Sequence, residues 1–121
     1  MATVELTAEN FNTTVSSGGL VLVDFWAEWC GPCRMFGPIF EKSSERHADA
    51  VFGKVDTEAQ PEVAAAFNIS SIPTLMIVRD NIVLYQQAGA LPAPALEELI
   101  TKAAALDMDE VRASLSASAQ A

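Results

Sequence analysis

Residues 20–27, with the sequence LVLVDFWA, constrain the fold more than any other stretch of this chain. The stretch is almost continuously apolar and contains several β-branched side chains, which is typical of a strand buried on both faces of a sheet. Such a strand needs other elements packed over both of its faces. The pattern therefore predicts a layered domain with this strand inside its sheet.

The rest of the chain alternates between helical and strand patterns. The link at 79–81 is short enough for a hairpin, so the last two strands should be antiparallel. We therefore predict one α/β domain with a mixed sheet over residues 1–106. The predicted helices cover 6–15, the stretch from the cysteines to about 48, 60–67 and 92–106, and the predicted strands are 20–27, 51–56, 74–78 and 82–87.

Residues 107–121 form a C-terminal extension in this prediction. Asp107 stands three residues before Glu110, which resembles a capping box. Met108, Val111 and Leu115 make a thin apolar stripe. We expect a short helix here, and packing on the sheet, binding of a partner and disorder all remain open for it.

The charge balance excludes some classes of partner. With 7 basic against 16 acidic residues, the 121-residue chain has a net charge of −9, whereas nucleic-acid binding and docking on anionic lipid both need clustered Lys and Arg. The N-terminus MATVELTAENF lacks the regions of a signal peptide, and no apolar run is long enough to span a bilayer. We therefore expect a soluble cytoplasmic protein, in which a persistent structural disulfide is not favoured.

Both cysteines of the chain, Cys30 and Cys33, follow directly after the buried strand. A structural zinc site needs four ligands, and the one histidine, His47, falls on the apolar stripe of the following helix. The ligand count disfavours a metal, and we expect no metal site. A Cys-x-x-Cys pair beside a βαβ pattern in a cytosolic protein instead indicates a redox pair.

The position of the pair suggests its mechanism. Cys30 stands where the strand ends and a helix begins, so its sulfur can face unpaired helix N–H groups, which favour the thiolate. Cys33 follows one turn later, and Gly31 and Pro32 form the tight turn between the two. A Cys30 thiolate would attack a substrate disulfide, and Cys33 would resolve the resulting mixed disulfide.

The motif DFWAEWCGPC, together with IPT at 72–74, resembles the thioredoxin family, and the resemblance extends over about residues 3–106. It implies a thioredoxin fold, with a central mixed sheet flanked by helices on both faces. It also implies a monomeric protein-disulfide reductase without a cofactor of its own. Its partners would be disulfide-containing client proteins and a flavin- and NADPH-dependent thioredoxin reductase.

Asp24 interrupts the apolar strand, so its carboxylate should be desolvated and its pKa raised. An edge position facing water is the alternative. By the family resemblance, Asp24 is a buried base that acts on Cys33, in many relatives beside a lysine of the next strand. Phe52 is expected at the place of that lysine, with Lys54 two residues on, so we expect Asp24 to lack this partner and to have a still higher pKa.

The resemblance also implies a docking surface for client chains. It implies a cis peptide bond before Pro73, although base rates for X–Pro bonds favour trans. Ile72 would offer its backbone to the client, and Trp29 would be an exposed edge of the surface, whereas burial in the core is the plain alternative for this tryptophan. A last docking loop would comprise Ala88, Gly89 and Ala90, where the missing side chain of glycine allows close approach of a backbone.

A different class of function is a redox-independent binding subunit built on the same fold. In that case the surface around Trp29 would bind a partner whatever the state of the cysteines. The cysteine pair, Asp24 and Pro73 count against this alternative, because binding alone requires none of them. We therefore expect a disulfide reductase.

Overall fold

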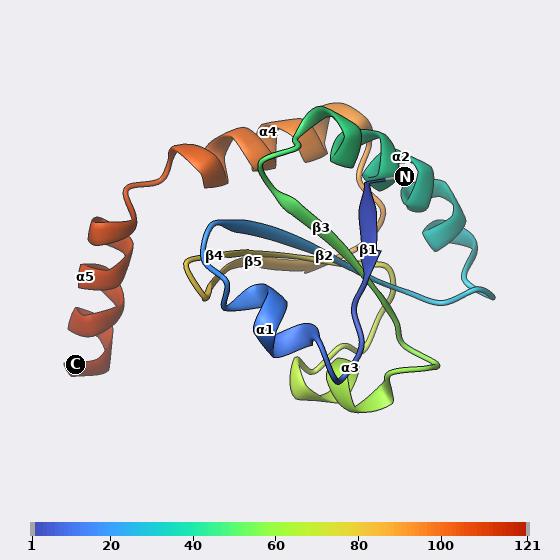
Figure 1. Ribbon diagram of the computed structural model, residues 1–121, viewed down its shortest axis with the longest axis horizontal. Helices are drawn as coiled ribbons and strands as arrows, with labels where there is room; N and C mark the ends of the chain where they lie inside the picture. Colours follow the sequence, from blue (N-terminus) through green and yellow to red (C-terminus); the bar gives the residue numbers. More distant parts are fainter. Residues whose placement is uncertain (1, 121) are drawn as a thin grey trace.

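The computed structural model describes the backbone of residues 2–120 and the side chains of residues 2–117. Five strands and five helices follow one another along this part of the chain (Figure 1). They are β1 (Thr3–Glu5), α1 (Phe11–Val15), β2 (Leu20–Trp26), α2 (Gly31–Arg46), β3 (Val51–Asp56), α3 (Pro61–Ala66), β4 (Thr74–Arg79), β5 (Ile82–Ala88), α4 (Ala93–Ala105) and α5 (Met108–Gln120).

The strands form one five-stranded sheet in the order β1-β3-β2-β4-β5. β3 is parallel to β1 and β2, whereas β4 is antiparallel to both β2 and β5. The predicted mixed sheet with a terminal hairpin is therefore confirmed. β2 is the central strand, which explains why its sequence is apolar at almost every position.

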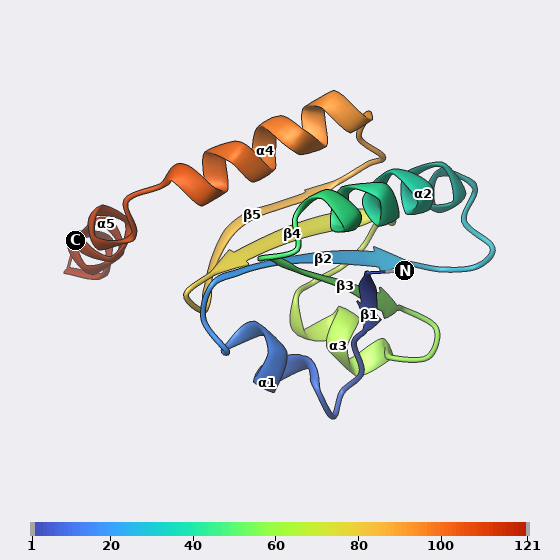
Figure 2. The ribbon, with the colours of Figure 1, turned by 45° about the horizontal axis from the view of Figure 1, so that its top comes forward.

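Helices cover both faces of this sheet. α1 and α3 lie on one face, and α2 and α4 lie on the other (Figure 2). Alternate residues of β2 serve the two cores: Val21, Val23 and Phe25 pack with the first pair of helices, whereas Leu22 packs with the second pair. Asp24, two residues beyond Leu22 in β2, thus points its side chain toward the α2 side of the sheet.

The N-terminal part of the chain differs from the prediction. β1 is not among the predicted elements, because its three residues are too few to show a period. The predicted helix over 6–15 is shorter in the structure, since it begins only at Phe11 with Asn10 as its N-cap residue. The side chain of Asn10 accepts a hydrogen bond of 2.7 Å from the backbone N–H of Thr7 and so stabilises the preceding turn.

The C-terminal extension contains a helix, α5, that projects beyond the end of α4 (Figure 1). Asp107 caps it, since its Oδ1 accepts hydrogen bonds from the N–H groups of Asp109 and Glu110 at 3.0 and 3.3 Å. Arg112 forms an ion pair of 3.5 Å with Asp80 in the β4–β5 turn. Among residues 2–120, no helix is both long and apolar enough to cross a membrane.

Candidate active site

Cys30 lies at the N-terminal end of α2, where the chain leaves the sheet. It is the N-cap residue, with an extended backbone at φ −86° and ψ 114°, and Pro32 lies in the first turn. The backbone N–H of Cys33 donates a hydrogen bond of 3.2 Å to the Cys30 sulfur. The predicted placement of this sulfur at the helix N-terminus is confirmed for one N–H group, that of Cys33.

The two cysteines form a disulfide, with their Cα atoms 5.2 Å apart. Both side chains are buried, packed with Ala27 and flanked by Trp26 and Ile72. Within residues 2–120, no group of three or more His, Cys, Asp and Glu side chains is arranged to hold a metal ion. His47, at the end of α2, lies with its Nε2 2.7 Å from a carboxylate oxygen of Glu97.

The loop before β4 lies against the disulfide. The Ile72–Pro73 peptide bond is cis, the isomer that the family resemblance implies. The carbonyl oxygen of Ile72 is 3.6 Å from the Cys30 sulfur. The N–H of Gly89, whose φ is +114°, donates a hydrogen bond of 2.8 Å to the carbonyl of Pro73. The structure thus joins the exposed loop Ala88–Ala90 to the proline loop, in which Ile72 packs against the cysteines.

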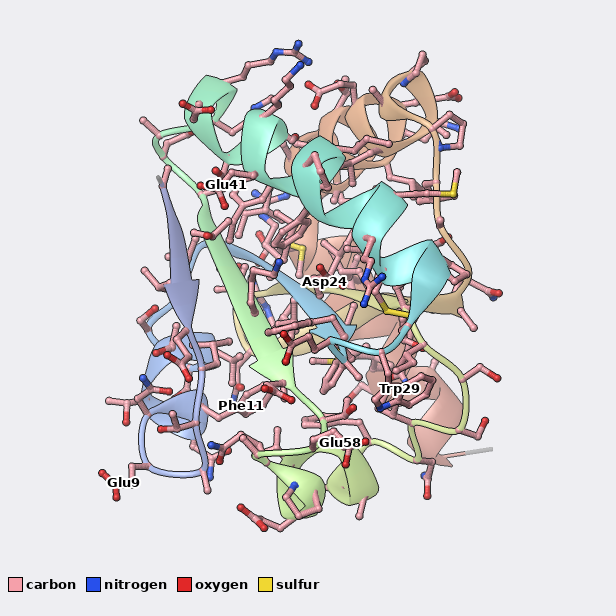
Figure 3. The ribbon with its side chains drawn as sticks, turned by 90° about the vertical axis from the view of Figure 1, so that its right-hand side faces the viewer. Glu9, Phe11, Asp24, Trp29, Glu41 and Glu58 are labelled. Atoms are coloured by element: carbon pink, nitrogen blue, oxygen red, sulfur yellow. A yellow bond between two sulfur atoms is a disulfide. The ribbon has the colours of Figure 1, made fainter. Side chains whose placement is uncertain are left out.

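Trp29, which directly precedes Cys30 in the chain, is 66% exposed, so the alternative that places it in the core is wrong. Its Nε1–H donates a hydrogen bond of 2.6 Å to Glu58 (Figure 3). The sequence did not point to Glu58, because nothing local marks a residue in the loop after β3 as the partner of one in the loop after β2. Two of the candidate docking residues thus adjoin the cysteine pair, Trp29 as the neighbour of Cys30 in the chain and Ile72 by packing against it.

Asp24 is completely buried in β2, so the alternative edge position is also wrong. Figure 3 shows it beneath α2, on the sheet face that Leu22 shares. Neither of its carboxylate oxygens has a hydrogen-bond partner among the described residues. Burial raises the pKa of Asp24 from 3.8 to about 7, against the opposing effect of the Lys54 charge.

The expectation that Phe52 occupies the lysine position beside Asp24 is wrong. In the parallel register of β2 and β3, Leu22 lies beside Phe52 and Asp24 lies beside Lys54. The Lys54 ammonium group is 3.8 Å from Oδ2 of Asp24, while Phe52 packs in the core against Phe40. Alternate residues of β3 share one face, so the sequence left open which of them meets Asp24.

Lys54 connects the buried carboxyl to the surface. Its side chain is 26% exposed, and its ammonium lies 5.0 Å from the centre of the Trp26 ring. It lines a surface cleft of about 430 Å³ together with Trp26, Asp56 and three residues of β1. Solvent therefore reaches the lysine while the carboxyl has no exposed surface, which limits how strongly the ion pair can favour ionised Asp24.

Comparisons with known proteins agree with this site. The family model described as Thioredoxin matches residues 2–102. A Streptomyces coelicolor protein named "Putative thioredoxin 2" is 64% identical over 111 residues, which are 92% of this chain and 83% of that protein. The "Thioredoxin" of Bacillus subtilis is 39% identical over 103 residues, which are 84% of this chain and 98% of that protein.

A solved structure gives the same result for the fold. A mutant thioredoxin from Halobacterium salinarum superposes with a TM-score of 0.79 at 30% identity, covering 87% of this chain and 92% of that one. The mixed sheet with helices on both faces is thus the thioredoxin fold that the sequence predicts. The chain belongs to the thioredoxin family and is a disulfide oxidoreductase whose redox-active pair is Cys30 and Cys33.

Proposed function

We propose that this protein reduces disulfide bonds in client proteins, with Cys30 as the attacking thiolate. Attack on one client sulfur breaks the client disulfide and forms a Cys30–client disulfide, while the other client sulfur leaves as a thiolate. The observation that carries this assignment is the hydrogen bond of 3.2 Å from the Cys33 N–H to the Cys30 sulfur. In the reduced protein the same N–H would stabilise negative charge on that sulfur.

Cys33 completes the transfer in this mechanism. Its thiol gives up a proton and attacks the Cys30 sulfur, which breaks the mixed disulfide and releases the second client sulfur as a thiolate. Two electrons have then passed to the client, and Cys30 and Cys33 are left as the disulfide. Asp24 would accept the Cys33 proton through water, and its pKa of about 7 suits this role because half of the carboxyl is ionised near neutral pH.

Client chains would dock on the surface around the disulfide. Ile72 would pair with an extended client segment as an added short strand, with its carbonyl close to Cys30. Gly89 leaves room for the client backbone, and Ala88 and Ala90 beside it have only small side chains. Trp29, exposed directly before Cys30, would provide a large apolar contact.

The family sets the general partners of this protein, which are a thioredoxin reductase and disulfide-containing client proteins. We further propose that the reductase is a flavin enzyme that takes electrons from NADPH, and that the protein acts as a cytoplasmic monomer. In this scheme the cofactors belong to the reductase. Only the sulfurs of Cys30 and Cys33 carry electrons in this chain.

Reduction of insulin with dithiothreitol as electron donor tests the proposal. The wild-type protein should accelerate the reaction, and Cys30→Ser should abolish the acceleration. Reduced Cys33→Ser, mixed with insulin after the dithiothreitol has been removed, should accumulate a mixed disulfide with the client. Full activity in Cys30→Ser would refute the mechanism. A variant with both Cys→Ser changes that retained every binding partner of the wild type would instead support the binding-subunit alternative, which no feature of the site favours.

A further inference from the structure

The loop after β3 is a pre-ordered turn. Oδ1 of Asp56 accepts hydrogen bonds from the backbone N–H groups of Glu58 and Ala59 at 3.0 and 3.4 Å. The N–H of Gln60 donates a hydrogen bond of 2.8 Å to the carbonyl of Asp56. These contacts fix the backbone from which the Glu58 side chain extends.

The same loop is attached to the segment that carries Cys30. The N–H and the hydroxyl of Thr57 both donate to the carbonyl of Trp26, at 2.9 and 3.1 Å. Glu58 then accepts the hydrogen bond of 2.6 Å from the Trp29 indole. The loop thus holds both tryptophans of the WAEW segment, the first by its backbone and the second by its side chain.

Trp29 needs such a contact because most of the residue is exposed to solvent. A side chain that is 66% exposed has few packing neighbours to select one rotamer. Among the described residues, the bond to Glu58 is the one hydrogen bond that its side chain makes. The acceptor is a carboxylate oxygen, so this bond is of the stronger, charge-assisted kind.

We propose that Glu58 is a positioning residue for client binding, which holds the Trp29 ring in the orientation that contacts the client. This inference rests on the proposed reductase function. A ring fixed beforehand loses no rotamer freedom when the client docks, and ordering one such side chain costs a factor of roughly 2 to 12 in affinity. Glu58 takes no part in the thiol chemistry, so its loss should affect binding and leave the rate at saturation unchanged.

Three variants separate the hydrogen bond from the charge. Glu58→Ala removes both, whereas Glu58→Gln keeps a carbonyl oxygen that can accept from the indole. Glu62→Ala is the matched control, because Glu62 is an exposed carboxylate in the first turn of α3 that makes no hydrogen bond to Trp29. Each reduced protein is mixed in single turnover with insulin at increasing concentration, and separately with the small disulfide 5,5′-dithiobis(2-nitrobenzoate).

We expect Glu58→Ala to raise the half-saturating insulin concentration by about three- to tenfold at an unchanged maximal rate. Glu58→Gln should stay within about twofold of the wild type, and so should Glu62→Ala. The rate with the small disulfide should not change, since that reagent needs no docking surface. In NMR spectra, the indole N–H signal of Trp29 should shift in Glu58→Ala, while that of Trp26 should stay in place.

Trp29→Phe keeps an aromatic ring but has no N–H to donate, so it tests the same bond from the other side. It should raise the half-saturating concentration like Glu58→Ala, and the double variant should be no worse than Trp29→Phe alone. If Glu58→Ala fails to fold, Trp29→Phe still tests the bond, because that variant cannot donate to Glu58. The inference would be overturned if Trp29→Phe or Glu58→Ala had the same half-saturating concentration as the wild type. It would also be overturned if either variant lowered the maximal rate instead of raising that concentration.

The same data separate this inference from the proposed function. If the wild-type protein reduces neither insulin nor the small disulfide, the reductase assignment fails, whatever Glu58 does. If the wild type reduces both and all of the variants match it, only the role of Glu58 fails.

Discussion

The carboxylate of Asp24 and the ammonium group of Lys54 lie 3.8 Å apart, at neighbouring positions of the parallel strands β2 and β3. Their interaction does not decide the charge of the aspartate. Burial raises the pKa of Asp24 to about 7, and Lys54 lowers it only in part. Desolvation wins because the carboxyl is fully buried, while water reaches the lysine and screens its charge.

The raised pKa of Asp24 predicts that neutral pH destabilises the protein. The pKa is 3.8 in the unfolded chain and about 7 in the native state, so within this window the native state binds a proton that the unfolded state has lost. Stability should therefore fall as the pH rises from about 4 to 7 and change little from this source above pH 7. The full effect of the shift is at most about 4 kcal/mol.

Asp24→Asn should remove this pH dependence. At pH 8 the variant should be more stable than the wild type by up to about 4 kcal/mol, and at pH 4 the two should be nearly equal. Urea unfolding of the oxidised proteins across this range measures the difference. An equal gain in stability at both pH values would contradict the assignment, because it would not depend on ionisation of Asp24.

Lys54→Met should raise the pKa of Asp24 further. The lysine charge is the one effect that lowers this pKa, so its removal leaves desolvation unopposed. The NMR chemical shift of the Asp24 carboxyl carbon, followed against pH, measures the change directly. Lys42→Met, on an exposed position of α2, is the matched control and should leave the titration unaltered.

An unchanged Asp24 titration in Lys54→Met would show that the ion pair has no energetic effect. If the proposed role of Asp24 is correct, a higher pKa also has a kinetic consequence. Less of the carboxylate is ionised at neutral pH, so the pH at which Cys33 resolves a mixed disulfide should rise together with the pKa.

The sequence predicted those parts of the fold that have a local pattern. The continuous apolar run of β2 predicts its central position, and the short link at 79–81 predicts the hairpin of β4 and β5. β1 was missed because three residues show no period and gain their strand structure only by pairing with β3. Pairing between distant segments has no local signature.

The same distinction holds for the site. Cys30 and Cys33 lie in one contiguous motif, so their placement at the start of α2 could be predicted. Lys54 and Phe52 lie on one face of β3, and only the parallel register decides which of them meets Asp24. Glu58 comes from a different loop than Trp29, so their contact could not be inferred from either segment alone.

Two glycines should respond to the same substitution with opposite signs. A Cβ at Gly53 in β3 would overlap the side chain of Leu6, which is fully buried, so Gly53→Ala should cost about 1–3 kcal/mol of stability. A Cβ at Gly37 in α2 would lie 3.7 Å from the Lys54 ammonium, an ordinary contact. Gly37→Ala should therefore stabilise the protein by about 0.5–1 kcal/mol, because alanine favours the helix.

Urea unfolding of both glycine variants at one pH measures these changes. A neutral Gly53→Ala variant would mean that Leu6 can move aside without cost. A destabilising Gly37→Ala variant would mean that Lys54 needs the open space beside the helix. In that case the titration of Asp24 in the Gly37→Ala variant should differ from that in the wild type.

The C-terminal extension should be dispensable for the redox reaction. Arg79, next to the turn that binds α5, pairs with Leu20 at the start of β2, whereas Cys30 follows the other end of that strand. We therefore expect a chain ending at residue 106 to fold cooperatively and to reduce insulin within about twofold of the full-length rate. It should lose about 1–3 kcal/mol of stability, since Met108 is buried in the full-length structure.

Met108→Ala in the full-length chain is the matched variant for this truncation. It keeps α5 but removes most of its buried contact, so its loss of stability should account for most of the loss on truncation. Thermal and urea unfolding, together with the insulin assay, measure both variants. If the truncated chain unfolds without cooperativity or loses its activity, residues 107–121 are part of the folded domain and the predicted boundary at residue 106 is wrong.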